Sequence, residues 1–133
     1  MADRPTTPGF DRYQPSSLLD LCGRLERYFS PKIVGEVNDV YVKVTKTKGE
    51  DVPWHAHDGE DELFLIVKGS LMMQIQDERS FPLHEGEFFI VPKGVRHRVS
   101  SEHDCWMMLI EAKSTKHTGD VKAEITKSLD EQM

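Results

Sequence analysis

The sequence has no long hydrophobic run, few cysteines and few positive charges. Its longest uninterrupted apolar runs are Leu63 to Val67 and Trp106 to Ile110. A transmembrane helix needs about 20 apolar residues, so neither run can cross a bilayer. The first 12 residues, MADRPTTPGFDR, also lack the apolar segment of a secretory signal. We therefore expect a cytoplasmic protein without a membrane partner.

Cysteine is limited to Cys22 and Cys105, which lie far apart in the sequence. Neither belongs to a CxxC pair or to the spacing of a zinc ribbon. We therefore predict two buried, reduced thiols. In the alternative reading, Cys105 acts as a nucleophile or redox sensor, and this would require a neighbouring base.

Positive charge is also scarce. The chain has 17 Lys and Arg against 23 Asp and Glu, which gives a formal net charge of −6. Nucleic acids and anionic membranes both attract concentrated positive charge, and the sequence contains no basic stripe. We therefore expect no nucleic-acid partner. The length of 133 residues fits one domain with a single core.

Most of the chain has a period of two. The segments Val40 to Thr45, Leu71 to Gln76 and Cys105 to Ile110 each divide into two sets of alternating side chains. Alternation of this kind predicts β-strands with two distinct faces. Glycines and prolines interrupt the chain at short intervals between Gly35 and Gly94. This pattern indicates an all-β protein with a small antiparallel sandwich or barrel.

The chain before these strands has helical periodicity. Ser16 and Ser17 are candidate N-caps, and the spacing of the apolar residues predicts a short amphipathic helix over residues 17–29 that packs against the β domain. Its apolar residues are Leu18, Leu21, Cys22, Leu25, Tyr28 and Phe29. We divide the chain into a lead and helix (1–31), a β domain (32–113) and a C-terminal segment (114–133).

Three histidines and one glutamate form a candidate metal site: His55, His57, Glu62 and His97. His55 and His57 are two residues apart and would leave the same face of a strand. Imidazoles combined with a carboxylate suit one divalent transition metal ion, namely Fe, Mn, Ni, Zn or Cu. Burying this cluster without a metal would leave unpaired polar groups, which argues against a purely structural role.

The other histidines are interpreted differently. We expect His84, His103 and His117 to be surface residues or to have ordinary hydrogen-bond partners. His117 has two further alternatives, because it could close over the rim of the β domain or contact a second subunit.

The spacing around the candidate ligands resembles the two signature motifs of the cupin superfamily. The first motif, G(x)5HxH(x)4E(x)6G, is matched at Gly49, His55, His57, Glu62 and Gly69. The second, G(x)5PxG(x)2H(x)3N, is matched at Gly86, Pro92, Gly94 and His97, with Ser101 in place of the final Asn. That final position is not a ligand in the family. The resemblance implies a small single-domain cupin, with a jelly-roll barrel (double-stranded β-helix) whose motifs meet around one metal ion.

The resemblance does not fix a reaction, because cupins include dioxygenases, isomerases, decarboxylases, lyases and hydrolases. Four protein ligands would leave an octahedral ion two free positions, unlike a closed structural zinc site. We predict a metal-dependent oxidoreductase, dioxygenase-like, acting on a small carbonyl, phenolic or acidic compound. The alternatives are a non-catalytic module that binds or senses a small molecule, a metal-dependent isomerase or lyase, and an empty structural site. No catalytic acid or base is assigned.

Alternation also predicts which residues surround the site, although a register error of one residue would exchange the faces. The candidate substrate-pocket residues are Tyr41, Phe64, Met73, Phe89, Val99 and Met107, with Trp54 and Gln74 as further neighbours. An apolar pocket with one charged centre suits a small aromatic or enolisable acid. Arg96 and Arg98 flank His97, but no arginine is assigned to an inward position, which disfavours a phosphorylated substrate. Because small cupins have exposed sheet edges, we expect a homodimer.

Overall fold

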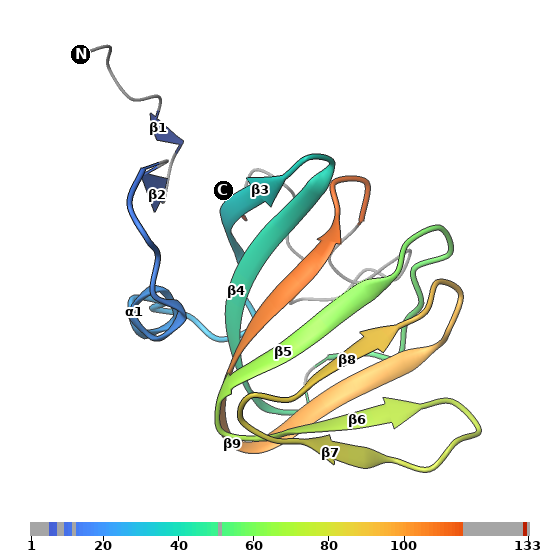
Figure 1. Ribbon diagram of the computed structural model, residues 1–133. Helices are drawn as coiled ribbons and strands as arrows, with labels where there is room; N and C mark the ends of the chain where they lie inside the picture. The colour runs from blue at the N-terminus through green and yellow to red at the C-terminus, as the bar shows by residue number, and fades with distance from the viewer. Residues whose placement is uncertain (1–5, 8–9, 12, 51, 116–131, 133) are drawn as a thin grey trace.

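Strands dominate the computed structural model, which describes residues 6–7, 10–11, 13–50, 52–115 and 132 (Figure 1). In chain order the elements are β1 (Thr6–Thr7), β2 (Phe10–Asp11), α1 (Leu18–Gly23), β3 (Lys32–Val37), β4 (Val40–Gly49), β5 (Glu62–Lys68), β6 (Leu71–Ile75), β7 (Phe81–Leu83), β8 (Phe88–Val91) and β9 (His97–Ala112). The prediction of an all-β protein with a short N-terminal helix is confirmed. None of the helices in these ranges is long and apolar enough to cross a membrane.

The long strand β9 joins the parts of the main sheet. Its first residues, His97 to Ser100, pair with β6, and the remainder lies between β4 and β5. The order across the sheet is β3-β4-β9-β5-β8, while β7 pairs with β6, and every pairing is antiparallel. Figure 1 shows β3 and β4 at one side of the domain and β6 and β7 at the other, with β5 and β8 between them. This arrangement is the jelly-roll barrel that the resemblance implies.

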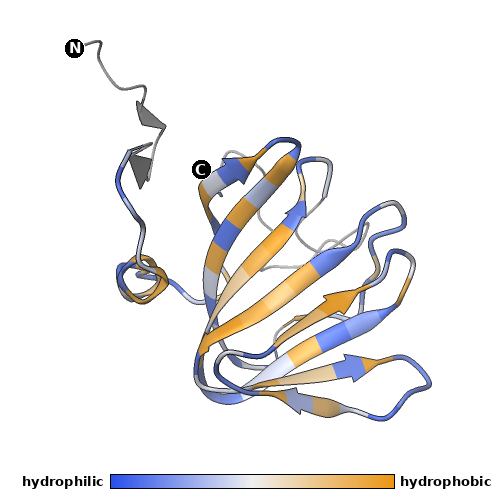
Figure 2. Ribbon diagram, in the orientation of Figure 1, coloured by the Kyte–Doolittle hydropathy of each residue, from blue (hydrophilic) through white to orange (hydrophobic). Residues whose placement is uncertain are grey.

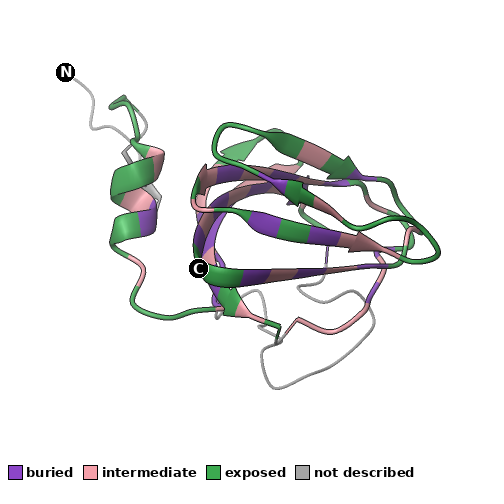
Figure 3. Cartoon of the chain, turned by 90° about the horizontal axis from the view of Figure 1, so that it is seen from below, coloured by how far each residue is buried: buried purple, intermediate pink, exposed green. Residues whose placement is uncertain are grey.

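The core lies on the inner faces of the strands. In β5, Glu62, Phe64 and Ile66 are buried, whereas the residues between them are half-buried. Buried and less buried positions alternate along the strands in Figure 3, as the period of two predicts. The main hydrophobic cluster consists of Phe64, Ile66, Leu71, Met73, Leu83, Val91, Val99, Cys105, Met107 and Leu109. Glu62 therefore shares a face with this core, which explains why its carboxylate is buried.

Strand β4 directs polar side chains inward. Lys43, Thr45 and Thr47 are each at most 5% exposed, and hydropathy alternates along this strand in Figure 2. Val44 is also fully buried, on the opposite face of the strand. Helix α1 packs against β4, β5 and β9 on the outside of the sheet (Figure 1). The barrel interior beside β4 is therefore more polar than its valines alone would indicate.

Helix α1 is shorter than the predicted 17–29 helix, because it ends at Gly23. The Ser17 hydroxyl accepts a hydrogen bond from the backbone N–H of Asp20 at 3.2 Å, which caps the helix as predicted. Beyond the helix, Phe29 has a φ of 54°, which no right-handed helix can accommodate. The apolar residues at 25, 28 and 29 therefore belong to the connection that leads into β3.

Cys22 and Cys105 are both free and fully buried. Burial raises the pKa of Cys22 to about 11 and that of Cys105 to about 12. Neither thiol is ionised near neutral pH, so the structure favours the predicted structural role over a nucleophile at Cys105.

Candidate metal centre

The two histidine-bearing segments are joined through their backbones. The N–H of His55 donates to the carbonyl oxygen of His97 at 3.0 Å, and the N–H of His97 donates back to His55 at 2.8 Å. The N–H of Gly94 also donates to the carbonyl of His57 at 2.8 Å. These bonds hold the loop that precedes Glu62 against the start of β9. Residues 42 positions apart in the chain, from 55 to 97, are thus brought side by side.

Two of the imidazole rings are oriented by nearby carbonyl groups. His55 Nδ1 lies 2.8 Å from the carbonyl oxygen of Pro53, and His97 Nδ1 lies 3.0 Å from that of Val95. A carbonyl oxygen only accepts hydrogen bonds, so each Nδ1 carries the proton and each Nε2 keeps its lone pair. This is the arrangement that typically orients a metal-binding histidine.

The four candidate ligands are buried and close together. One ligand atom from each of His55, His57, Glu62 and His97 lies within 4.8 Å of all the others. Glu62 Oε1 is 3.4 Å from His57 Nε2 and 3.7 Å from His97 Nε2, and neither contact is aligned as a hydrogen bond. Both Nε2 atoms are buried and lack a hydrogen-bond partner among the described residues. Because a divalent ion would satisfy such unpaired ring nitrogens, the cluster fits a metal, whose identity stays a prediction.

The ionisation of the cluster also favours a cation. Burial disfavours the charged ring and lowers the pKa of His55 to about 4. Burial alone would also lower the pKa of His57, but the neighbouring Glu62 carboxylate outweighs this effect, so the pKa of that ring is raised. For Glu62, burial is outweighed by the Glu111 carboxyl and the His57 and His97 rings, which hold the pKa well below its ordinary value. His55 is therefore neutral and Glu62 charged near neutral pH.

A buried ion pair lies behind Glu62 and was not singled out from the sequence. Glu111 is opposite Glu62 in the pairing of β9 with β5, and the two carboxyl groups lie within hydrogen-bonding reach. Lys43 Nζ is 2.5 Å from Glu111 Oε1 and also contacts the side-chain oxygen of Gln132. Burial and the charge of Glu62 raise the pKa of Glu111 well above its ordinary value. Lys43 is two residues from the predicted pocket residue Tyr41, so strand alternation could have placed its side chain on the same inward face.

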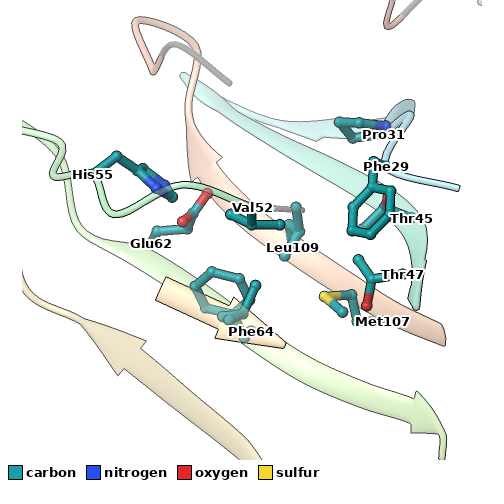
Figure 4. A pocket seen from close by; sticks show the side chains of 11 residues that line it. Phe29, Pro31, Thr45, Thr47, Val52, His55, Glu62, Phe64, Met107 and Leu109 are labelled. Carbon is teal, nitrogen blue, oxygen red and sulfur yellow. The ribbon is translucent and has the colours of Figure 1, made fainter. Parts of the chain in front are cut away.

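A pocket extends from the candidate ligands into the barrel (Figure 4). Its volume is about 450 Å³ including its mouth. Its walls are formed by Phe29, Pro31, Thr45, Thr47, Val52, His55, Glu62, Phe64, Val99, Met107 and Leu109. Two of the candidate ligands, His55 and Glu62, therefore face a space that a small molecule can enter.

The structure places the predicted pocket residues in different environments. Phe64, Val99 and Met107 line the pocket. Met73 is instead fully buried in the hydrophobic cluster, and Phe89 packs edge-on against Phe81 with ring centroids 4.9 Å apart. Tyr41 lies beside amino groups, with Lys43 Nζ 5.8 Å and Lys113 Nζ 5.3 Å from its ring. Trp54 lies near Arg96, and Gln74 is half-buried in β6.

The structure separates His84 and His103 from the candidate ligands. His84 and His103 are exposed, in agreement with their interpretation as surface residues. His117 lies outside the described residues, as does most of the segment 114–133. Ser101, the departure from the second motif, has its hydroxyl 3.3 Å from that of Thr47. Its role is therefore a local hydrogen bond on the pocket wall.

The chain is similar to one protein family and to several individual proteins. Over 85 residues it is 31% identical to the uncharacterized protein YdbB of Bacillus subtilis (strain 168), an alignment that covers 64% of this chain and 74% of that protein. A cupin-2 domain containing protein from Shewanella frigidimarina NCIMB 400 is 32% identical, with a TM-score of 0.70, over 73% of this chain and 93% of that one. Protein NMB1881 from Neisseria meningitidis is 29% identical, with a TM-score of 0.67, over 74% and 99%.

The family match covers the strands that carry the candidate site. The profile of the cupin domain family matches residues 42–112, which is more than half of the chain. This range contains the four candidate ligands and runs from β4 to the end of β9. The chain therefore belongs to the cupin domain family.

Proposed function

We propose that this protein is a metal-dependent enzyme with dioxygenase-like chemistry that acts on a small carbonyl, phenolic or acidic compound. One observation carries the proposal: His55 and Glu62 are candidate metal ligands and also form part of the pocket wall. An ion held there would be reachable by a small molecule, whereas a structural metal is normally enclosed by its protein ligands. A bound divalent ion supplies Lewis-acid polarisation and, if it is iron or copper, redox chemistry.

The pocket favours this class over reactions that need a separate acid or base. Among the described residues on its wall, the ionisable groups are His55 and Glu62, and both are candidate ligands. An isomerase normally moves protons with a positioned side chain, and none remains for that task. The chain's own contribution would be to orient the ligands through the Pro53 and Val95 carbonyls and to exclude water with apolar walls.

The same walls indicate the type of substrate. Phe64, Val99, Met107 and Leu109 are apolar and less than 9% exposed. No lysine or arginine is found among the pocket-lining residues of the described chain. A phosphorylated compound would lack a counter-charge there, whereas an apolar acid or diketone can place its oxygens at the ligand cluster.

Nitric oxide binding tests the proposal directly. We would load the protein anaerobically with Fe(II), add nitric oxide as a surrogate for dioxygen, and record electron paramagnetic resonance spectra with diketones, catechols and 2-oxo acids. We expect an adduct whose spectrum changes with a substrate-like compound, and oxygen uptake with that compound. His97→Ala should abolish both signals, while the exposed His84→Ala should retain them.

The other outcomes separate the alternatives. Spectral change without turnover under Fe, Mn, Ni or Zn would support a non-catalytic binding module. Absence of any adduct from metal-loaded protein would contradict an accessible metal and refute the proposal.

A further inference from the structure

The end of the pocket remote from the candidate ligands bears hydroxyl groups. Thr45 and Thr47 of β4 lie there with Phe29 and Pro31, as Figure 4 shows, while Glu62 lies at the opposite end. Phe64, Val52 and Leu109 line the pocket between the two ends, and Met107 lies beside Thr47 (Figure 4). The pocket is thus polar at both ends and apolar in the middle.

The Thr45 hydroxyl has no hydrogen-bond partner among the described residues. Thr45 is 5% exposed, and its Oγ1 makes no hydrogen bond with any residue that the structure describes. The neighbouring Thr47 differs, because its hydroxyl lies 3.3 Å from Ser101 Oγ. Burial of an unpaired hydroxyl is unfavourable, and valine would fill the same volume without this cost. Because Thr45 also lines the pocket, its hydroxyl is a candidate hydrogen-bond partner for a bound ligand.

Phe29 provides a second, independent observation at the same end. Its φ of 54° lies in the left-handed region, which is unfavourable for a bulky side chain. Its N–H donates to the carbonyl oxygen of Lys46 at 2.8 Å, so the residue is anchored beside Thr45 on β4. Backbone strain of this kind collects at ligand-binding sites. Here it places an aromatic ring on the pocket wall next to the unpaired hydroxyl (Figure 4).

We propose that Thr45 is a specificity-determining residue, whose hydroxyl binds a polar atom at the end of the substrate remote from the metal, with Phe29 packing over that end. This inference rests on the proposed function for the metal end of the pocket. The substrate would carry metal-binding oxygens at one end, an apolar or aromatic middle, and a neutral hydroxyl or carbonyl group at the other end. The remote group is neutral because no basic side chain lines the described pocket.

Matched ligand pairs test the assignment. We would load the protein with Zn(II), which is redox-inactive, and measure binding by calorimetry for benzoylformate and phenylpyruvate, each with and without a para-hydroxyl group. In the unmodified protein, the hydroxylated member of at least one pair should bind about tenfold more tightly than its parent compound. This ratio corresponds to the free energy of about one hydrogen bond. Thr45→Val should remove this preference, and Thr45→Ser should retain it.

Thr115→Val is the matched control. Thr115 is 9% exposed and its hydroxyl also has no partner in the described part of the chain, but Thr115 does not line the pocket. Both valine variants should melt no lower than the unmodified protein, because each loses an unpaired buried hydroxyl. Only the change at Thr45 should alter the ligand preference.

The outcomes distinguish the subsite from the function. No preference for any hydroxylated ligand in the unmodified protein, or a preference that survives in Thr45→Val, would overturn the role of Thr45. Failure of the proposed function would appear separately, as absence of a nitric oxide adduct or of oxygen uptake. Metal content should be equal in all Thr45 variants.

Discussion

At the scale of single residues, the candidate ligands differ from the other histidines in burial and in partners. His55, His57 and His97 are at most 5% exposed, and two of their rings are fixed by backbone carbonyls. His84 and His103 have neither feature. The motif spacing identified this group because a fixed spacing on paired strands determines which side chains meet. The motifs include neither Lys43 nor Glu111, so only the strand alternation that Lys43 shares with Tyr41 could have placed its side chain inward.

Removal of a candidate ligand should cost metal affinity but not the fold. We expect His57→Ala and Glu62→Ala to lower affinity for a divalent metal by more than about 100-fold, because the loss of a direct ligand exceeds that of an outer-shell partner. Circular dichroism should still report a β protein, since the apolar cluster is separate from these side chains. The exposed control variants His84→Ala and His103→Ala should retain metal in elemental analysis. Equal loss in the controls would refute the ligand assignment.

Lys43→Met should destabilise the protein. It would leave Glu111 and Glu62 buried without their cation, and breaking a buried pair typically costs about 3–5 kcal/mol. Lys48→Met, at an exposed position of the same strand, is the control and should change the free energy of unfolding little. Urea denaturation measures both. A loss below about 1 kcal/mol for Lys43→Met would show that the pair is not a net contributor.

The metal-free protein should lose stability through His55 as the pH falls. The pKa of this ring is about 4 in the folded protein and 6.5 when exposed, so between these values only the unfolded chain binds the proton. Relative to the unmodified protein, His55→Gln should therefore gain up to about 3 kcal/mol between pH 6.5 and 4. His57 has the opposite shift, and its contribution is lost only as the pH rises above 6.5. If urea titrations gave the unmodified protein and His55→Gln the same change in stability across this pH range, the lowered pKa of His55 would be wrong.

At the scale of elements, alternation correctly predicted strands and placed Phe64, Val99 and Met107 on inward faces, but it did not single out the polar inward residues of β4. In β4 the valines resemble a core stripe, yet Lys43, Thr45 and Thr47 face the barrel interior. The reason is that α1 covers the outer face, so that Val44 is buried there. The sequence predicted that this helix packs against the β domain, but it could not show which face of β4 the helix covers, because that depends on a tertiary contact. The same limitation explains why Thr45 was absent from the predicted pocket while Phe64 and Met107 were included.

Gly69, between β5 and β6, should tolerate no side chain. Its φ is +85°, and an added Cβ would lie 2.3 Å from the carbonyl oxygen of Asp104 in β9. Gly86 has a similar φ of +81° but open space around it. Gly86→Ala should therefore cost about 1–2 kcal/mol from backbone strain alone, and Gly69→Ala clearly more. Equal losses in thermal unfolding would mean that β9 can move away from the turn.

At the scale of the whole molecule, β8 is one of the two edges of the described β3-β4-β9-β5-β8 order. Phe88 and Ile90 on this strand are 60% and 46% exposed, and the order of strands ends there. An unpaired edge that carries exposed apolar side chains is a surface on which a second copy can add. This feature supports the proposal that the protein forms a homodimer.

Charged residues on β8 should separate that dimer. We expect the double change Phe88→Lys and Ile90→Lys to yield a monomer in analytical ultracentrifugation, without loss of metal binding. Val37→Lys is the control, because Val37 is 60% exposed on β3 at the opposite edge. If the dimer persists in the β8 double variant but dissociates in Val37→Lys, the interface lies on the β3 edge instead.

The reciprocal backbone bonds between His55 and His97 also provide an internal reporter of site opening. Each of these amide hydrogens is held by the other residue's carbonyl, so neither can exchange with solvent deuterium until the two segments separate. An ion that bridges the two rings would have to be released for the same separation. Protection of these two amides should therefore increase with metal concentration in step with occupancy, while amides at the exposed turn near Asp77 should exchange at an unchanged rate. Metal loading can thus be followed through backbone amides, whatever the metal and whether or not the protein has a substrate present.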